Sequence, residues 1–335
     1  MSTTLYFLIP ISMLAVAWSL CFVGCFLQTS GLASPYSDAI LTDPNLKPIL
    51  VAYWPLNDLI GPQLNEQTNK AGPTAFQAQD LSGNGHVGTY VIPFAYPPPT
   101  PALPSAQITN PSLQRGATIV AGDAGSTKNP LAASADFGGG FVSIPWSSQN
   151  SPQLDQFTFE GWVQPKWTGS GARRVVFGAL GPGDATGFVI FIDENNQWQI
   201  VVGTGAGNMP LQTMIPIDPT STTSTYVAVT CDQNTNVSLW INPAGQGDTD
   251  NTPPPPPPTW PPAPMATGYT ATPPSQLATI FIGTGQNEVT TVRTQDGGAG
   301  APLFPFQGLI QSIALYDAAL DAATLQSHFL LGSGS

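Results

Sequence analysis

The stretch of residues 156–165, which reads Q-F-T-F-E-G-W-V-Q-P, constrains the fold more than any other part of the chain. Its apolar positions recur with a period of two, which is the pattern of a β-strand that places one face against a core. One face carries Phe157, Phe159, Gly161 and Val163, and the other carries Thr158, Glu160, Trp162 and Gln164. The stretch therefore predicts a strand in a layered β-structure.

Short apolar runs of the same kind recur along the chain, which indicates an all-β architecture. A first strand is expected from residue 49 and a strand pair at 135–145, and further strands are expected at 173–180, 187–193, 197–203, 225–232, 236–242, 277–284 and 306–317. The polar segments 194–196 and 233–235 separate neighbouring runs and predict hairpin turns. Asp321 is placed to cap a short C-terminal helix over residues 322–330.

The composition excludes several classes of protein. Charged residues make up 8% of the chain, against about 25% in an average soluble domain. The 34 glycines and 36 prolines favour turns and short strands over helical bundles. The net charge of −12 offers no basic surface to a phosphate backbone, so nucleic acid is excluded as a partner. Cys231 is the only cysteine outside the N-terminal run, so the folded part contains no internal disulfide.

The N-terminal segment predicts a membrane anchor. Residues 5–27 are apolar apart from two serines, and about 20 such residues suffice to span a bilayer. The run is longer than the apolar core of a signal peptide, about 7–15 residues, so we expect residues 1–27 to be a retained, single-pass transmembrane helix. Cleavage after Ala33 and lipidation at Cys25 are the alternatives. Because a large acidic domain follows the helix, that domain is expected outside the cytoplasm, in the periplasm or at the cell surface.

Small residues recur within this segment at a spacing that suits helix packing in lipid. Ala17, Cys21 and Cys25 follow one another every four residues, with Gly24 beside them. Such a stripe lets a second helix approach closely. We therefore expect these four residues to be a packing surface for another membrane subunit, although small residues are also common in membrane helices that have no partner.

The segments around the expected strands define the domain boundaries. Residues 28–48 are interpreted as a polar linker, residues 49–330 as the folded domain and residues 331–335 as a tail. Two Pro-rich inserts, 92–130 and 243–276, interrupt the domain, and the second contains six consecutive prolines at 253–258. Such a run adopts an extended polyproline II helix that cannot join a sheet. The inserts are expected either to contact a partner or to be exposed spacers.

The order of the motifs resembles that of the laminin-G-like, concanavalin-A-like jelly roll of bacterial surface proteins. The matching motifs are Y-W-P-L-N-D at 53–58, D-L-S-G-N-G-H-V-G-T at 80–89, F-V-S-I-P at 141–145, F-T-F-E-G-W-V-Q-P at 157–165, Y-V-A-V-T-C-D at 226–232, V-S-L-W-I-N at 237–242 and F-Q-G-L-I-Q-S-I-A-L-Y-D-A-A-L at 306–320. The resemblance implies two stacked antiparallel sheets with Greek-key connections.

Some relatives of this fold are glycoside hydrolases, but the sequence lacks the residues for hydrolysis. Retaining hydrolysis needs two carboxyl groups about 5–5.5 Å apart. Glu160 stands alone on its strand, and Asp193 and Glu194 are adjacent and so point to opposite sides. Only His86 and His328 are available as bases, and neither accompanies a nucleophile motif. We therefore expect no enzymatic activity.

Two ligand sites remain open on the sequence. The resemblance implies a structural calcium ion at Asp80, Asn84 and Gly85, although Gly138 and Gln311 stand where relatives often have an acid; no other cofactor is expected. Aromatic and amide side chains suit a glycan platform, which would comprise Glu160, Trp162 and Gln164 on one strand and Ser238, Trp240 and Asn242 on another. The alternative is that both tryptophans pack inside the sandwich.

Two functions follow from these expectations. The first is a non-catalytic accessory or scaffold subunit of a membrane complex, held by its helix and its sandwich. The second is a membrane-anchored, lectin-like module that binds carbohydrate at the cell surface.

Overall fold

The computed structural model describes most of the expected β-domain. The described residues are 35–58, 77–91, 113–123, 126, 133–138, 140–146, 152–168, 171–181, 185–243, 264–273, 275, 279–285 and 304–334. The predicted anchor and its small-residue stripe, Ala17, Cys21, Gly24 and Cys25, lie outside these ranges, so the anchor stays a prediction. Within these ranges, no helix is long and apolar enough to cross a membrane.

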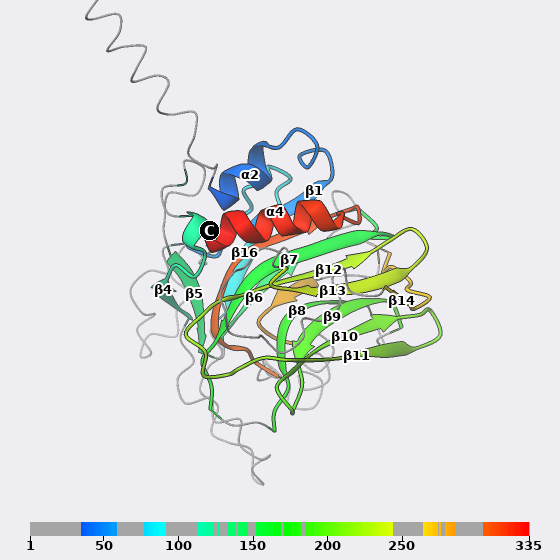
Figure 1. Ribbon diagram of the computed structural model, residues 1–335. Coiled ribbons are helices and arrows are strands. Elements are labelled where there is room, and N and C mark those ends of the chain that lie inside the picture. Colours follow the sequence, from blue (N-terminus) through cyan, green and yellow to red (C-terminus); the bar gives the residue numbers. More distant parts are fainter. Residues whose placement is uncertain are drawn as a thin grey trace, which may run out of the picture. The chain divides into compact units, whose positions relative to one another are not determined.

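Two antiparallel sheets form a sandwich, as the alternating strands predicted (Figure 1). Sheet A has the order β14 (Met265–Ala266), β13 (Asn236–Ile241), β12 (Thr225–Cys231), β7 (Phe157–Pro165), β16 (Gln307–Tyr316), β5 (Ala133–Gly138) and β4 (Leu113–Ala117), and β1 (Leu50–Trp54) also pairs with β16. Sheet B has the order β11 (Asn208–Pro216), β10 (Gln197–Gly203), β9 (Gly187–Ile192), β8 (Arg174–Leu180), β15 (Thr279–Ile282), β6 (Phe141–Pro145), β3 (Gly88–Val91) and β2 (Gln77–Ala78).

The core between the sheets is aromatic at its centre. Phe157 and Phe159 of β7 point inward and are fully buried. Phe157 stacks on Phe188 of β9 with ring centroids 4.0 Å apart, and Phe159 lies 4.7 Å from Phe177 of β8. Burying one phenylalanine side chain contributes about 1.5–3 kcal/mol, so this cluster is a main source of the cohesion between the two sheets.

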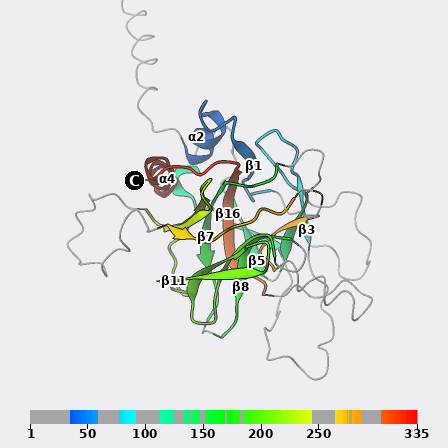
Figure 2. The ribbon, with the colours of Figure 1, turned by 90° about the vertical axis from the view of Figure 1, so that its right-hand side faces the viewer.

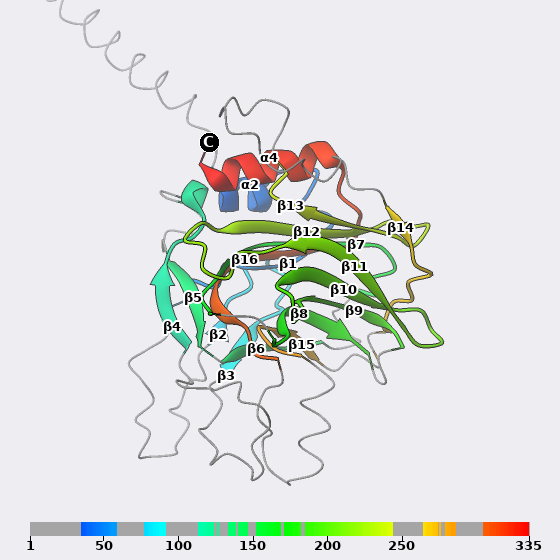
Figure 3. The ribbon, with the colours of Figure 1, turned by 60° about the horizontal axis from the view of Figure 1, so that its bottom comes forward.

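A helical layer covers the outer face of sheet A. It consists of α2 (Tyr36–Thr42), the short 3-10 helix η1 (Ala121–Asp123) and α4 (Ala322–Ser333). Figures 1 and 2 both show α2 and α4 over sheet A, and Figure 3 shows sheet B on the other side. Both faces of β7 are therefore buried, which explains why Thr158 and Glu160 are as inaccessible as Phe159.

The N-terminal part of this layer corrects the predicted linker. Residues 35–48 are not a spacer: they contain α2 and a turn, and Tyr36 and Ile40 are fully buried. The helix has only seven residues, so it carries too few turns for a clear helical period. Its fold depends on the sheet beneath it, because an isolated helix shorter than about 12–15 residues is marginal in water.

Parts of the predicted inserts also belong to the sandwich. The first insert contributes β4, which pairs with β5, and η1; the second contributes β14, which pairs with β13. The six-proline run lies outside the described residues. The predicted strand pair at 135–145 is corrected as well, since β5 lies in sheet A and β6 in sheet B. The glycine-rich junction between them carries the chain from one sheet to the other.

Most other boundaries match the sequence expectations within one or two residues. Both predicted hairpins are confirmed, because β9 pairs with β10 and β12 with β13. Asp321 caps α4 as predicted, accepting a hydrogen bond of 2.8 Å from the Thr324 amide. The helix runs on to Ser333 and ends at Gly334, whose φ is +73°, so most of the predicted tail 331–335 is helical.

Candidate functional site

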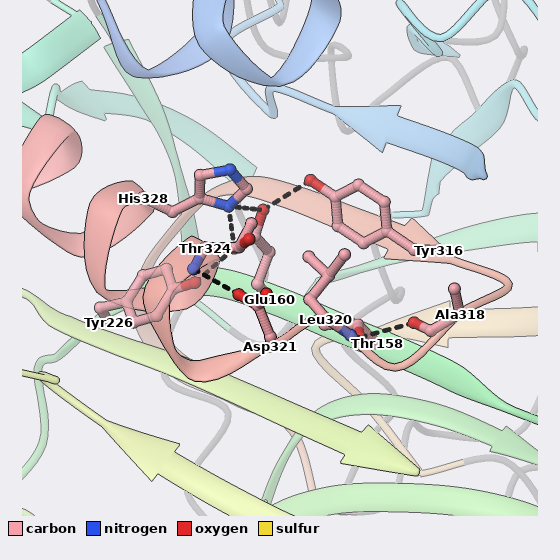
Figure 4. A network of polar contacts seen from close by, with 9 residues as sticks. All are labelled: Thr158, Glu160, Tyr226, Tyr316, Ala318, Leu320, Asp321, Thr324 and His328. Atoms are coloured by element: carbon pink, nitrogen blue, oxygen red, sulfur yellow. Dashed lines mark hydrogen bonds and ion pairs between the residues drawn. The ribbon is translucent and has the colours of Figure 1, made fainter. Parts of the chain in front are cut away.

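A buried polar network surrounds Glu160 on the outer face of sheet A (Figure 4). Its Oε1 atom accepts a hydrogen bond of 2.7 Å from the Tyr316 hydroxyl, and its Oε2 atom accepts one from the Tyr226 hydroxyl. Nδ1 of His328, on α4, lies 3.1 Å from Oε1 and 3.0 Å from Oε2. Glu160 is fully buried and His328 is nearly so.

The sheet register leaves room for this carboxylate. Glu160 pairs with Ala228 of β12 on one side and with Ala314 of β16 on the other. These small side chains let the two tyrosines reach in from the neighbouring positions on their strands. His328 comes down from α4, the helix that starts at the Asp321 cap. Figure 4 shows these three side chains converging on the carboxylate.

The electrostatics of the network favour an ion pair. Burial by itself raises the pKa of Glu160, but the charge of His328 and the hydrogen bonds to the carboxylate outweigh burial and hold the pKa below its usual range. Burial lowers the pKa of His328, and the Glu160 carboxylate outweighs it, so the pKa lies above its usual value. The pair is enclosed and its carboxylate oxygens are occupied, so the arrangement ties α4 to the sheet.

The predicted glycan platform lies in the same covered face. That prediction required the two strands to be neighbours, but β12 lies between β7 and β13 and pairs with both. Trp162 is only 2% exposed and packs beneath Phe329 of α4, with centroids 6.0 Å apart. Trp240 is 6% exposed, and its Nε1 donates a hydrogen bond of 3.1 Å to Thr230. Neither ring presents a face to a ligand, because the helical layer and the neighbouring strands cover them.

The polar members of the predicted platform are engaged at its edge. Gln164 donates its amide to the Thr222 carbonyl. Asn242 accepts a hydrogen bond of 2.7 Å from the Tyr226 amide. Ser238 is buried on β13. The structure therefore brings these residues to one face of sheet A but uses them to complete the packing there.

Asp80, the centre of the predicted calcium site, organises its turn through hydrogen bonds. Its Oδ1 atom accepts the backbone amides of Tyr53 at 3.0 Å and Ser82 at 2.9 Å. Its Oδ2 atom accepts the amide of His86 at 2.8 Å. A carboxylate that accepts three backbone N–H groups satisfies both of its oxygens without an ion.

The other predicted calcium ligands have structural roles of their own. Asn84 donates its side-chain amide to two backbone carbonyls of β1, at 2.8 and 2.9 Å. Gly85 has a φ of +83°, a conformation that favours glycine. Within the described part of the chain, no three His, Cys, Asp or Glu side chains group as metal ligands would. These contacts explain the motif as a structural turn.

The remaining cysteine and histidine among the described residues, Cys231 and His86, are buried. Cys231 faces the core, and burial raises the pKa of its thiol to about 12, which keeps it protonated. His86 stacks on Trp146 with centroids 4.6 Å apart, and burial lowers its pKa. Neither residue has the exposed, activated environment of a nucleophile or general base.

Sequence reasoning missed a second buried network, which joins α2 to the sheet. The Asp123 carboxylate accepts the Ser37 amide at 2.8 Å, the Ser37 hydroxyl at 2.6 Å and the Ser312 hydroxyl at 3.0 Å. The Tyr53 hydroxyl donates to Ser312 at 3.1 Å. These residues come from α2, η1, β1 and β16, so no local pattern in the sequence could have grouped them.

The outer face of sheet B differs because no helical element of the described chain covers it. Its apolar side chains form a small cluster around Val175 and Val189, with Phe191, Val201 and Phe304 only partly buried. Just before β8, Arg173 places its guanidinium 5.9 Å from the ring centroids of both Phe191 and Phe304. Its Nε donates to Glu194 at 2.8 Å. We call Arg173, Phe191, Glu194 and Phe304 the Arg173 cluster.

The comparisons with known proteins identify the family. The family described as the concanavalin A-like lectin/glucanases superfamily matches residues 137–326. The chain therefore belongs to this superfamily, as the order of its motifs predicted. No curated protein matches the sequence significantly.

Several solved structures are similar to this chain at low identity. Domain 4 of AbnA, a GH43 extracellular arabinanase from Geobacillus stearothermophilus in complex with arabinotriose, is 16% identical, with 84% of this chain and 98% of that domain covered and a TM-score of 0.43. Trypanosoma rangeli sialidase is 15% identical, with 84% and 32% covered and a TM-score of 0.43. A botulinum neurotoxin type C chain, whose cell entry depends on two ganglioside molecules, is 11% identical, with 85% and 51% covered and a TM-score of 0.43. The chain thus spans about a third of the sialidase and half of the neurotoxin chain.

Proposed function

We propose that the protein is a non-catalytic carbohydrate-binding module whose ligand site is the Arg173 cluster on the outer face of sheet B. The observation that carries the proposal is the contrast between the two outer faces. Sheet A buries its tryptophans under helices, whereas sheet B leaves two phenylalanine rings partly exposed beside a half-exposed Arg173–Glu194 pair. Membership of a superfamily that contains lectins supports the same function.

The chemistry of the cluster suits a sugar. Saccharide rings present C–H groups on one side and hydroxyls around the rim, so they need an apolar surface next to a few charge-assisted hydrogen-bond groups. Phe191 and Phe304 supply the apolar surface. Glu194 can accept hydrogen bonds from hydroxyls, and Arg173 can donate to ring and hydroxyl oxygens.

Catalysis is not part of this proposal. A retaining hydrolase needs two carboxyl groups about 5–5.5 Å apart, flanking an accessible bond. Glu160 is enclosed by two tyrosines and a histidine, and the cluster itself contributes one carboxylate, Glu194. The protein is therefore expected to retain polysaccharides without shortening them.

A glycan array probed with the full chain tests the proposal. Phe191→Ala is expected to lower retention of the bound glycan at least tenfold while leaving the unfolding midpoint nearly unchanged. Leu81→Ala, which truncates a side chain that is 37% exposed on a different turn, is the matched control and should bind normally. Loss of binding in the Leu81 variant as well, or unaltered binding in the Phe191 variant, would contradict the assigned site.

A second candidate function, an accessory subunit of a membrane complex, rests on the N-terminal sequence. The predicted anchor at 1–27 would hold the sandwich outside the cytoplasm, and the stripe Ala17, Cys21, Gly24 and Cys25 would pack on a partner helix. Carbonate extraction followed by protease treatment of intact cells tests the anchor and its orientation. Purification in mild detergent followed by mass spectrometry tests the partner, which Ala17→Leu together with Cys21→Leu should release.

A further inference from the structure

We propose that the Arg173 cluster selects sugars that carry a carboxylate, such as uronic acids. This inference rests on the proposed function and narrows it to acidic glycans. The side chain of Arg173 is 49% exposed although two aromatic rings lie next to its guanidinium.

The geometry of Arg173 leaves its terminal nitrogens available. Among the described residues, its hydrogen-bond acceptor is Glu194, which contacts Nε at 2.8 Å. An arginine held at Nε keeps its two terminal NH₂ groups, which can donate to further acceptors. A planar guanidinium that offers such donors matches a carboxylate, with two parallel hydrogen bonds, better than it matches a single hydroxyl.

The two phenylalanines prepare this guanidinium for an anion. Cations within about 6 Å of an aromatic centroid are attracted to the ring face, and both rings lie at that distance from Arg173. The rings also exclude part of the water around the cation, which strengthens its interaction with a bound carboxylate. The parts of the two rings that the guanidinium leaves uncovered then contact the apolar side of the sugar.

Phe304, whose ring lies beside Arg173, has a strained backbone conformation. Its φ is +55°, a genuine outlier for a bulky side chain. Its carbonyl accepts a hydrogen bond of 2.9 Å from the Val175 amide, which fixes it against the start of β8. Strain of this kind persists where the surroundings impose it, often at ligand clamps.

Arg173 differs from two other cations of the described chain, Lys166 and Arg174. Lys166 forms an ion pair with Asp136 at 2.9 Å and has no aromatic neighbour of this kind. Arg174 is buried, lies 4.4 Å from the Trp167 ring centroid and donates to the Ala172 carbonyl. The chain as a whole repels acidic ligands, with its net charge of −12. At physiological salt the screening length is about 8 Å. A ligand that touches Arg173 is therefore influenced more by this residue than by acidic residues farther away.

The test compares each acidic saccharide with its own methyl ester, which removes the charge and keeps the sugar. We would use polygalacturonate, hyaluronate and sialyllactose, and measure binding to the full chain by calorimetry at physiological salt. At least one acid should bind about tenfold more tightly than its ester. Arg173→Gln should abolish that difference in affinity. Arg173→Lys should retain part of it, and Lys166→Gln should leave it unchanged.

The outcomes distinguish failure of acid selection from failure of the proposed carbohydrate-binding function. If neutral glycans are retained, and each acid binds no more tightly than its ester, acid selection is overturned and carbohydrate binding stands. If no glycan on the array or in this series is retained, both are overturned. Should Arg173→Gln lower the unfolding midpoint, the comparison of acid with ester in the unmodified protein and in Arg173→Lys still decides the question.

Discussion

Nδ1 of His328 lies 3.0 Å from Oε2 of Glu160, although 168 positions separate the two residues in the sequence. The contact joins the last helix of the domain to the central part of sheet A. It is shielded from water on all sides, since the side chains of His328 and Glu160 are 5% and 0% exposed. This buried pair therefore contributes to holding α4 on the sheet, while the Asp123 network joins α2 and η1 to it.

Glu160→Gln is expected to destabilise the protein by about 3–5 kcal/mol, because it leaves His328 buried without its charge partner. The new amide would also direct an N–H group at a hydroxyl that now donates. Urea unfolding monitored by tryptophan fluorescence measures the loss. Glu194→Gln is the matched control, since it removes the same charge from an exposed pair, where the expected change is below about 1 kcal/mol.

The Glu160–His328 pair should give a stability maximum between about pH 4.5 and 6.5. The pKa of Glu160 is held below its ordinary value of 4.5, so its contribution is present above that pH and is lost as the pH falls through the lowered value. The pKa of His328 is raised above its ordinary value of 6.5, so its contribution is full below that pH and is lost as the pH rises through the raised value.

Thermal unfolding across this pH range, with His328→Gln as the comparison, checks the expectation. The decline on the alkaline side should disappear in the variant. His86, whose pKa burial lowers, acts in the opposite sense, but it is present in both proteins, so the difference between the curves isolates His328. Parallel curves for the two proteins would show that the pair does not titrate as the structure indicates.

Gly332→Ala should destabilise the protein even though alanine normally favours a helix over glycine by about 1 kcal/mol. An added Cβ atom would lie 2.7 Å from Cε2 of Trp162, so the ring or the helix must move. A cost of about 1–3 kcal/mol is expected from overpacking. Gly207→Ala, where a Cβ meets nothing within 4 Å, should be neutral, and Trp162→Phe in the Gly332 variant should recover part of the loss.

Asp80→Asn is expected to cost about 1–3 kcal/mol, because one of its oxygens becomes an amide that faces the backbone N–H of His86. Since the backbone amides satisfy the carboxylate, adding calcium or EDTA should leave the unfolding temperature of the unmodified protein unchanged. If calcium raised the unfolding temperature of the unmodified protein but not that of the Asp80→Asn variant, the result would support the predicted calcium site.

The sequence predicted the sandwich because its signals are local. The alternation of Phe157 and Phe159 marks the inner face of β7, and polar turns fix the hairpins. The same pattern could not show that the opposite face is buried too, because α2 is too short to have a clear period and η1 lies within a Pro-rich insert. Trp162 therefore fitted a ligand platform as well as a core position.

The candidate site was less predictable for the same reason. Arg173 precedes β8 and Phe304 precedes β16, and no spacing in the sequence links them. Likewise, the sequence placed His328 on the terminal helix and Glu160 on a strand, but it did not predict the contact between them. Pairs of this kind become visible only when the register of both sheets is known.

The position of β16 has a consequence for how the chain is made. This strand lies between β7 and β5 and also pairs with β1, yet it is the last of the described strands in chain order. Sheet A therefore has a gap at its centre until residues 307–316 have been synthesised, and non-local pairings of this kind form slowly. A nascent chain that stops before residue 306 has no centre for sheet A and no α4 to cover Glu160, so premature termination yields an open, protease-sensitive product instead of a smaller stable domain.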